Sequence, residues 1–136
     1  MATVFETRLI GNIGKDAVCK NLDNGLLAIS FPVAHNKQWK DKRSGERKTK
    51  TTWVNCTIWK KENSNTKILD FLTTGTLVEV IGTPIAKAYK QEDDSIRTEI
   101  RLNVSKTNIL RPGNKKEDLY DSFSIDEDDD FDFDQD

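Results

Sequence analysis

Residues 52–60 read Thr-Trp-Val-Asn-Cys-Thr-Ile-Trp-Lys, a run rich in β-branched and aromatic residues that predicts a β-strand. Side chains alternate between the two faces of a strand, so Val54, Cys56 and Ile58 share one face and form an apolar stripe. The other face carries an asparagine, a threonine and two indoles, those of Trp53 and Trp59, about 20 Å apart at roughly 3.3 Å per residue. Large aromatics on a polar face are poor core residues and good stacking platforms for unpaired bases.

The segment around this strand is basic. All three tryptophans lie between Lys37 and Lys61, a window with nine basic residues and two acidic ones. Single-stranded nucleic acid requires cations for its phosphates and flat partners for its bases, and this window offers both. A solvated hairpin is the alternative interpretation of the charge run. We predict phosphate contacts by the nine basic residues of the window and by Lys87, which shares a strand face with Tyr89: Lys37, Lys40, Lys42, Arg43, Arg47, Lys48, Lys50, Lys60, Lys61 and Lys87.

The charge of the chain is divided. Residues 1–113 contain 19 Lys and Arg against 12 Asp and Glu, a net charge of +7. Residues 114–136 contain 2 basic residues against 11 acidic ones, a net charge of −9. A basic body predicts a polyanionic ligand, and an acidic tail predicts either competition for the same surface or recruitment of other proteins. A tail that only keeps the protein soluble is the alternative.

The periodicity along the chain predicts a mainly β fold. Residues 40–50 form a polar, charged stretch around a Ser-Gly pair, which predicts a long basic hairpin. Asn63–Thr74 is the only helix candidate, with polar residues at its start and a glycine after its end. Five strands with one helix between the third and fourth match the OB-fold, a Greek-key barrel that binds oligonucleotides across one face. The predicted strands are Val4–Ile10, Leu26–Ala34, Thr52–Lys60, Leu77–Ile81 and Ile96–Val104.

Length and composition predict one folded domain over residues 1–111, followed by a short linker and an acidic, disordered tail over residues 112–136. Cys19 and Cys56 have no metal-ligand spacing and are expected to be buried free thiols rather than a disulfide. With His35 as the single histidine, we expect no metal site, no cofactor and no catalytic residue. No apolar run is long enough to span a bilayer and no signal segment is present, so we expect a cytoplasmic protein.

Several short motifs resemble those of the bacterial and phage single-stranded DNA-binding proteins over roughly residues 5–110. They are Leu9-Ile10-Gly11-Asn12-Ile13-Gly14 with Asp16, Trp39-Lys40-Asp41-Lys42, Ser44-Gly45-Glu46, Thr52-Trp53, Ile58-Trp59-Lys60, Gly75, Gly82, Thr98-Glu99 and Asn103-Val104. That family stacks bases on four aromatic positions, which fall here on Trp39, Trp53, Trp59 and Tyr89. The resemblance implies a non-catalytic, largely sequence-independent binder that protects single-stranded DNA in replication, recombination and repair. It also implies a homotetramer associated with the nucleoid.

The C-terminal tail departs from the family pattern. Relatives usually end in acidic residues followed by Pro-Phe, which docks on repair and replication proteins. This chain keeps the acidic charge and a pair of aromatics but lacks Pro-Phe, which suits a phage or mobile-element variant with its own replication partners. The residues predicted to bind partner proteins are Asp128, Asp129, Asp130, Phe131, Asp132 and Phe133.

Two functions of other classes remain open from the sequence. An RNA-binding or RNA-chaperone OB module of cold-shock type fits the same aromatic face, because the choice between RNA and DNA depends on contacts to the 2′-hydroxyl. A metal-dependent nuclease would need clustered carboxylates. Asp93, Asp94 and the tail aspartates are the only candidates, and the first two lie in a predicted turn.

Overall fold

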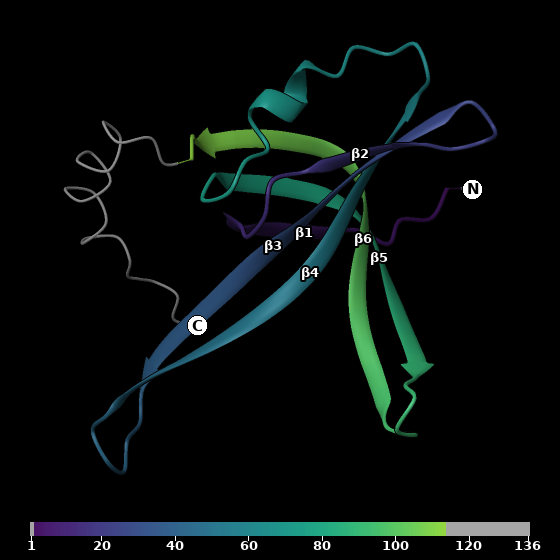
Figure 1. The fold of residues 1–136 in the computed structure, drawn as a ribbon. Helices are drawn as coiled ribbons and strands as arrows, with labels where there is room; N and C mark the ends of the chain where they lie inside the picture. The colour runs from purple at the N-terminus through teal and green to yellow at the C-terminus, as the bar shows by residue number, and fades with distance from the viewer. Residues whose placement is uncertain (1, 114–136) are drawn as a thin grey trace.

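Six β-strands form the fold of residues 2–113, the part of the chain that the computed structural model describes (Figure 1). Figure 1 shows a curved sheet from which two long two-stranded arms extend in different directions. The elements are β1 Thr7–Ile13, β2 Val18–Asn21, β3 Leu26–Lys40, β4 Arg47–Lys61, a single 3₁₀ turn η1 Lys67–Asp70, β5 Leu77–Lys90 and β6 Ile96–Arg111.

The sheet closes on itself. Its strand order is β1-β5-β6-β4-β3-β2, and β1 pairs with β3 as well as with β5. All neighbours run antiparallel except β4 and β6, which run parallel. This arrangement agrees with the predicted mainly β, OB-type fold. Each of the five predicted strands is present with shifted or longer bounds, and β2 is an additional strand. Its four residues are all exposed, so no alternation of apolar and polar residues marked it in the sequence.

The apolar stripe of β4 lies in the core, as predicted. Val54 and Cys56 are buried, and Ile58 packs against the same cluster. On β3 the alternate residues Ile29 and Val33 are fully buried. Each buried aliphatic side chain of this kind contributes about 1.5–3 kcal/mol through removal of its surface from water. The core therefore holds one end of each long strand and leaves the other end free.

The free ends are the two arms. β3 and β4 remain paired in unbroken register from Leu26 opposite Lys61 to Lys40 opposite Arg47. The predicted basic hairpin is therefore the end of a two-stranded ribbon with 15 residues in each strand. Gly45 turns its tip with φ at +76°, a backbone conformation that favours glycine. β5 and β6 form the second arm and stay paired out to Lys90 opposite Ile96. Almost every arm residue beyond the core is exposed.

The predicted helix over Asn63–Thr74 is wrong: this segment contains only the 3₁₀ turn Lys67–Asp70. Short polar side chains compete with a helix by bonding nearby backbone groups. The Asn65 side chain accepts a hydrogen bond from the Lys67 amide at 2.8 Å, and the Asp16 carboxylate accepts one from the Thr74 amide at 2.8 Å. Leu72, which is fully buried, anchors the segment to the core. No helix within residues 2–113 is long and apolar enough to cross a membrane.

The two cysteines are free, but only one of them is buried. Burial raises the pKa of the Cys56 thiol to about 12, whereas Cys19 on β2 is exposed. The expectation of buried thiols therefore holds for Cys56 and fails for Cys19. Cys19 lies on the unpredicted strand β2, an edge strand whose four residues are all exposed.

Candidate nucleic-acid interface

The polar face of β4 is an exposed aromatic surface. The side chains of Trp53 and Trp59 keep 54% and 47% of their surface exposed. Directly opposite them on β3 stand two small buried residues, Ala34 and Ala28 respectively. Small residues beside each indole leave the ring faces accessible. We call this side of the sheet the outer face; it comprises the outward residues of β3, β4, β5 and β6 that surround Trp53 and Trp59.

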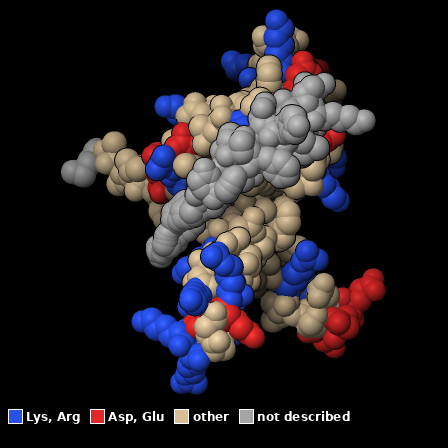
Figure 2. Space-filling view, turned by 90° about the vertical axis from the view of Figure 1, so that its left-hand side faces the viewer, with Lys and Arg blue, Asp and Glu red and all other residues tan. Residues whose placement is uncertain are grey.

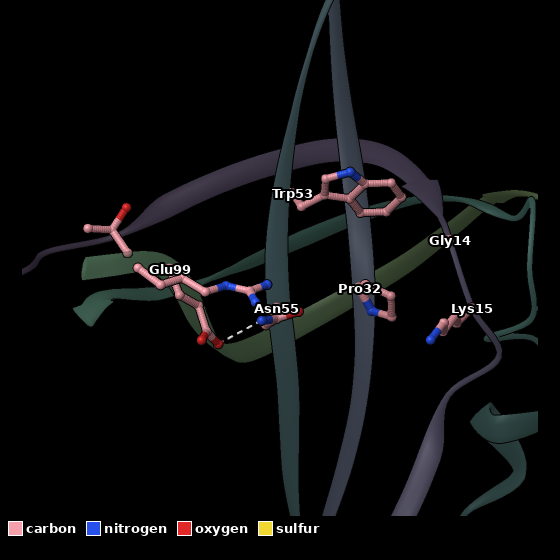
Figure 3. A pocket seen from close by; sticks show the side chains of 8 residues that line it. Gly14, Lys15, Pro32, Trp53, Asn55 and Glu99 are labelled. Carbon is pink, nitrogen blue, oxygen red and sulfur yellow. Dashed lines mark hydrogen bonds between the residues drawn. The ribbon is translucent and has the colours of Figure 1, made fainter. Parts of the chain in front are cut away.

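A pocket of about 720 Å³ lies beside Trp53 on the outer face. Figure 3 shows the indole near Pro32, with Gly14 and Lys15 on the neighbouring segment. The six-membered ring passes so close to Gly14 that a Cβ atom there would lie 2.5 Å from Cζ3 of Trp53. Glycine is therefore required at this position if the ring is to keep its place. The pocket is lined by Gly14, Lys15, Pro32, Trp53, Asn55, Arg97, Thr98 and Glu99.

Glu99 lies at the centre of the outer face and joins three strands. Its carboxylate accepts hydrogen bonds from the Tyr89 hydroxyl at 2.7 Å, from Asn55 Nδ2 at 2.6 Å and from Arg101 Nε at 2.8 Å. The Arg101 guanidinium, followed by the Tyr89 hydroxyl and the Asn55 amide, lowers the pKa of Glu99 from 4.5 to about 2. The same contact with the Glu99 carboxylate raises the pKa of Tyr89. Glu99 is therefore ionised at neutral pH.

Trp59 is held by another residue of β6, the strand that also carries Glu99. Its indole Nε1–H donates to the Asn103 side-chain oxygen at 3.2 Å. Asn103 lies opposite Thr57 in the parallel pairing of β4 and β6, one diagonal step from Trp59. The indole thus lies across the boundary between the two strands with its ring exposed.

The four aromatics predicted to stack on bases do not share one face. Tyr89 stands opposite Arg97 on the β5–β6 arm, and its hydroxyl reaches the outer face at Glu99. Trp39 stands five residues beyond Ala34 on β3, an odd number in unbroken register, so alternation places it on the other face of the β3–β4 ribbon from Trp53. Among the described residues the outer face therefore contains three of the four rings.

The predicted phosphate-binding residues also fall into groups. Those on the β3–β4 arm are Lys37, Lys40, Lys42, Arg43, Arg47, Lys48 and Lys50; Lys60 and Lys61 stand at the other end of β4, and Lys87 stands on the β5–β6 arm. Figure 2 shows basic side chains clustered around the end of one arm and acidic ones at the end of the other. In the arm, Lys48 Nζ lies 3.5 Å from an Asp41 carboxylate oxygen, an exposed pair that holds the side chain only weakly.

The outer face includes residues that were not among the predicted site residues, namely Lys15, Pro32, Asn55, Glu99, Arg101 and Asn103. Glu99, Arg101 and Asn103 alternate with Ile100, Leu102 and Val104 along the predicted strand Ile96–Val104, which is consistent with one polar face. What the sequence did not reveal is that β6 pairs with β4 in parallel, which brings that face beside the tryptophans.

The nuclease alternative finds no support within residues 2–113, where no group of three or more His, Cys, Asp or Glu side chains could hold a metal ion. Asp93 accepts hydrogen bonds from the Ser95 amide and hydroxyl in its turn, and Asp94 pairs with Lys90 at 3.5 Å. The predicted partner-binding residues of the tail lie outside the described residues.

Comparisons with known proteins agree with this geometry. Residues 4–110 match the family described as the Single-strand binding protein family. Among solved structures, the chain is similar to the SSB of Plasmodium falciparum in complex with ssDNA, with 25% sequence identity and a TM-score of 0.58 over 82% of this chain and 96% of that one. It also shares the fold of a small single-stranded DNA-binding protein from Streptomyces coelicolor, with 19% identity and a TM-score of 0.58 over 80% of this chain and 96% of that one.

The depressed pKa of Glu99 predicts a specific acid response. Its folded value of about 2 lies below the ordinary 4.5, so the stabilisation it contributes is complete above about pH 4.5 and is lost as the pH falls toward 2. Between these limits wild type should lose more stability than Glu99→Gln, while above them the difference between the two proteins should stay constant. Urea unfolding across the range and carboxyl NMR of Glu99 measure this; a carboxyl that titrates near 4.5 would contradict it.

Proposed function

The chain belongs to the single-strand binding protein family, and from this membership together with the exposed aromatic face we infer that it is a non-catalytic protein that binds single-stranded DNA. The observation that supports this most directly is the pair Trp53 and Trp59 on a polar strand face, flanked by small residues and by the basic β3–β4 arm. Each base stacked on such a ring contributes roughly 1–3 kcal/mol. Because every base has a π face, binding is largely independent of sequence.

The position of Trp39 indicates the course of the bound strand. Bases that stack on Tyr89, Trp53 and Trp59 lie on the outer face, whereas a base on Trp39 lies on the other face of the β3–β4 arm. A strand that contacts all four must therefore pass around the arm. The arm's lysines and arginines, which point to both sides of the ribbon, neutralise the phosphates along that turn.

We further propose that the protein acts in replication, recombination and repair in the cytoplasm, at the nucleoid, as a homotetramer. Assembly is supported by apolar side chains on the outside of the barrel, where Ile10 is 39% exposed and Leu110 is 48% exposed. Apolar surface of this kind is buried when copies associate. The acidic tail is proposed to limit access of DNA to the basic surface and to recruit partner proteins through Phe131 and Phe133.

Replacing the stacking residues tests the assignment. Trp53→Ala should weaken binding to oligo-dT by roughly 1–3 kcal/mol, and Trp53→Ala with Trp59→Ala by more, with the fold retained because both side chains are exposed. Fluorescence titration measures this, since single-stranded DNA should quench tryptophan emission strongly and duplex DNA weakly. Phe71→Ala removes an aromatic that is 53% exposed in the η1 connection and serves as the control. A folded double variant with wild-type affinity would exclude the stacking role.

The same titration separates DNA from RNA as the ligand. Matched oligo-dT and oligo-U strands compete for the same aromatic face, and they differ in the 2′-hydroxyl and in the thymine methyl group. We expect oligo-dT to displace oligo-U. Tighter binding of oligo-U would favour the RNA-chaperone alternative.

The basic arm predicts a change in salt dependence. Replacing Lys40, Lys42 and Arg43 by glutamine should reduce the slope of log affinity against log salt by about 2, since each direct contact to a single strand contributes roughly 0.7. The loss of affinity should be the same for every base sequence, because phosphate contacts carry no sequence information. Lys20, Lys67 and Lys106 lie off the arms, so their replacement by glutamine is a control with equal charge change. An unchanged slope in the arm variant would mean that these three side chains are solvated and do not contact phosphates.

Truncation after Pro112 tests the tail. Residues 114–136 carry a net charge of −9 against +7 for the rest, so at low salt they should compete with DNA for the basic surface. The truncated protein should bind DNA more tightly at low salt, and this gain should shrink above about 0.1 M, where the screening length is about 10 Å. Changing Phe131 and Phe133 to serine should abolish capture of partner proteins and leave DNA affinity unchanged. Equal low-salt affinities of the full-length and truncated proteins would exclude competition.

A further inference from the structure

A half-buried charge at the centre of the outer face requires an explanation. Glu99 stands among the rings that stack on bases, and its carboxylate is a negative charge on a surface that must attract phosphates. Its side chain is only 13% exposed, and its pKa of about 2 keeps it ionised at the pH where DNA is bound. The Arg101 guanidinium at 2.8 Å offsets the charge locally.

The contacts of this carboxylate are directed toward an aromatic residue. One oxygen accepts from the Tyr89 hydroxyl at 2.7 Å, while the other accepts from Asn55 and Arg101. Tyr89 is on the β5–β6 arm, 42% exposed and outside the core cluster. A hydrogen bond at the tip of an exposed tyrosine restricts χ1, which determines where the ring lies, because the hydroxyl oxygen lies on the axis of χ2. The bond to Glu99 therefore limits the positions of a ring that packing leaves free.

A similar contact exists four residues along β6, where Asn103 accepts from the Trp59 indole. Glu99, Arg101 and Asn103 alternate on the outer face, and we call them the β6 polar row. Its first and last members each hold one ring of a neighbouring strand. Trp53 is held differently, by its close approach to Gly14. All three outer-face rings are thus restrained before any ligand is bound.

We propose that Glu99 is a positioning residue that holds the Tyr89 side chain in the place on the outer face where its ring stacks on a base, so that DNA binding does not have to restrict it. This inference rests on the proposed function. Ordering one free side chain on binding costs roughly a factor of two to ten in affinity. Avoiding this cost raises the affinity for DNA, whereas the repulsion between the Glu99 carboxylate and the phosphates lowers it. Arg101 reduces that repulsion.

Two substitutions with the same charge separate positioning from electrostatics. Glu99→Gln and Glu99→Ala both remove the negative charge, but only glutamine can keep the contacts: its oxygen can accept from Asn55 and Arg101 while its amide nitrogen donates to the Tyr89 hydroxyl oxygen. We expect Glu99→Ala in the full-length chain to bind oligo-dT about two- to ten-fold more weakly than Glu99→Gln, with equal salt slopes. Tyr89→Phe keeps the ring, loses the hydroxyl and should weaken binding by a similar factor. Equal or tighter binding by Glu99→Ala would overturn the proposal.

The pathway of the effect is tested in the Tyr89→Phe background. If Glu99 acts through the hydroxyl, the difference between Glu99→Ala and Glu99→Gln should fall to less than about two-fold there, as expected when two residues act through one shared contact. A difference that persists would assign the effect to Asn55 or Arg101 and overturn the role of Tyr89. Asn108→Ala removes a side-chain hydrogen bond of the same strand to Glu79, and it should leave DNA affinity unchanged.

A measurement without DNA distinguishes failure of this inference from failure of the proposed function. The chain has two tyrosines, so ¹³C-tyrosine NMR of the free protein reports on the Tyr89 ring. Its signals should match wild type in Glu99→Gln and move toward those of an exposed tyrosine that averages over its χ1 rotamers in Glu99→Ala, with the thermal midpoint showing that both variants are folded. Unchanged ring signals in folded Glu99→Ala would overturn positioning, whether or not the protein binds DNA.

Discussion

The parallel pairing of β4 with β6 is the contact on which both the fold and the candidate interface depend. It joins Val54 to Ile100 and continues to Ile58 opposite Val104, and without it the sheet would not close through β1 and β3. On its inner side it brings Cys56 and Leu102 together in the core. On its outer side it places the β6 polar row next to the tryptophans. A single pairing register therefore determines the packing and the chemistry of the surface at once.

The β3–β4 and β5–β6 pairings continue as arms beyond the point where a core can support them. A two-stranded ribbon is only marginally stable in water by itself, so each arm depends on the anchored half of its strands. The advantage of the ribbon is that both of its faces are available to a ligand. Trp39 shows this, because the alternation that buries Val33 in the barrel places Trp39 on an exposed surface farther along the same strand.

Much of this arrangement follows from the sequence and some of it does not. Period-two alternation predicted that Val54 and Cys56 are buried and that Trp53 and Trp59 are exposed. It did not show that the strands pair well past the core. The predicted helix failed because its polar start and the glycine after its end describe only local preference. Asn65 instead bonds the backbone two residues on, and the bond of Asp16 to Thr74 is made only in the folded chain. The Glu99 contacts likewise join three strands that are distant in sequence.

The outer face combines fixed rings with a tolerance for any base sequence, and the two properties have one physical origin. Gly14, Glu99 and Asn103 act on the edges or tips of Trp53, Tyr89 and Trp59, which leaves the flat faces of the rings available. The polar groups that could read a base edge are largely engaged with one another: the Glu99 carboxylate accepts from three protein donors. A surface whose hydrogen-bonding groups are satisfied internally offers bases mainly π contact, and π contact does not distinguish one base from another.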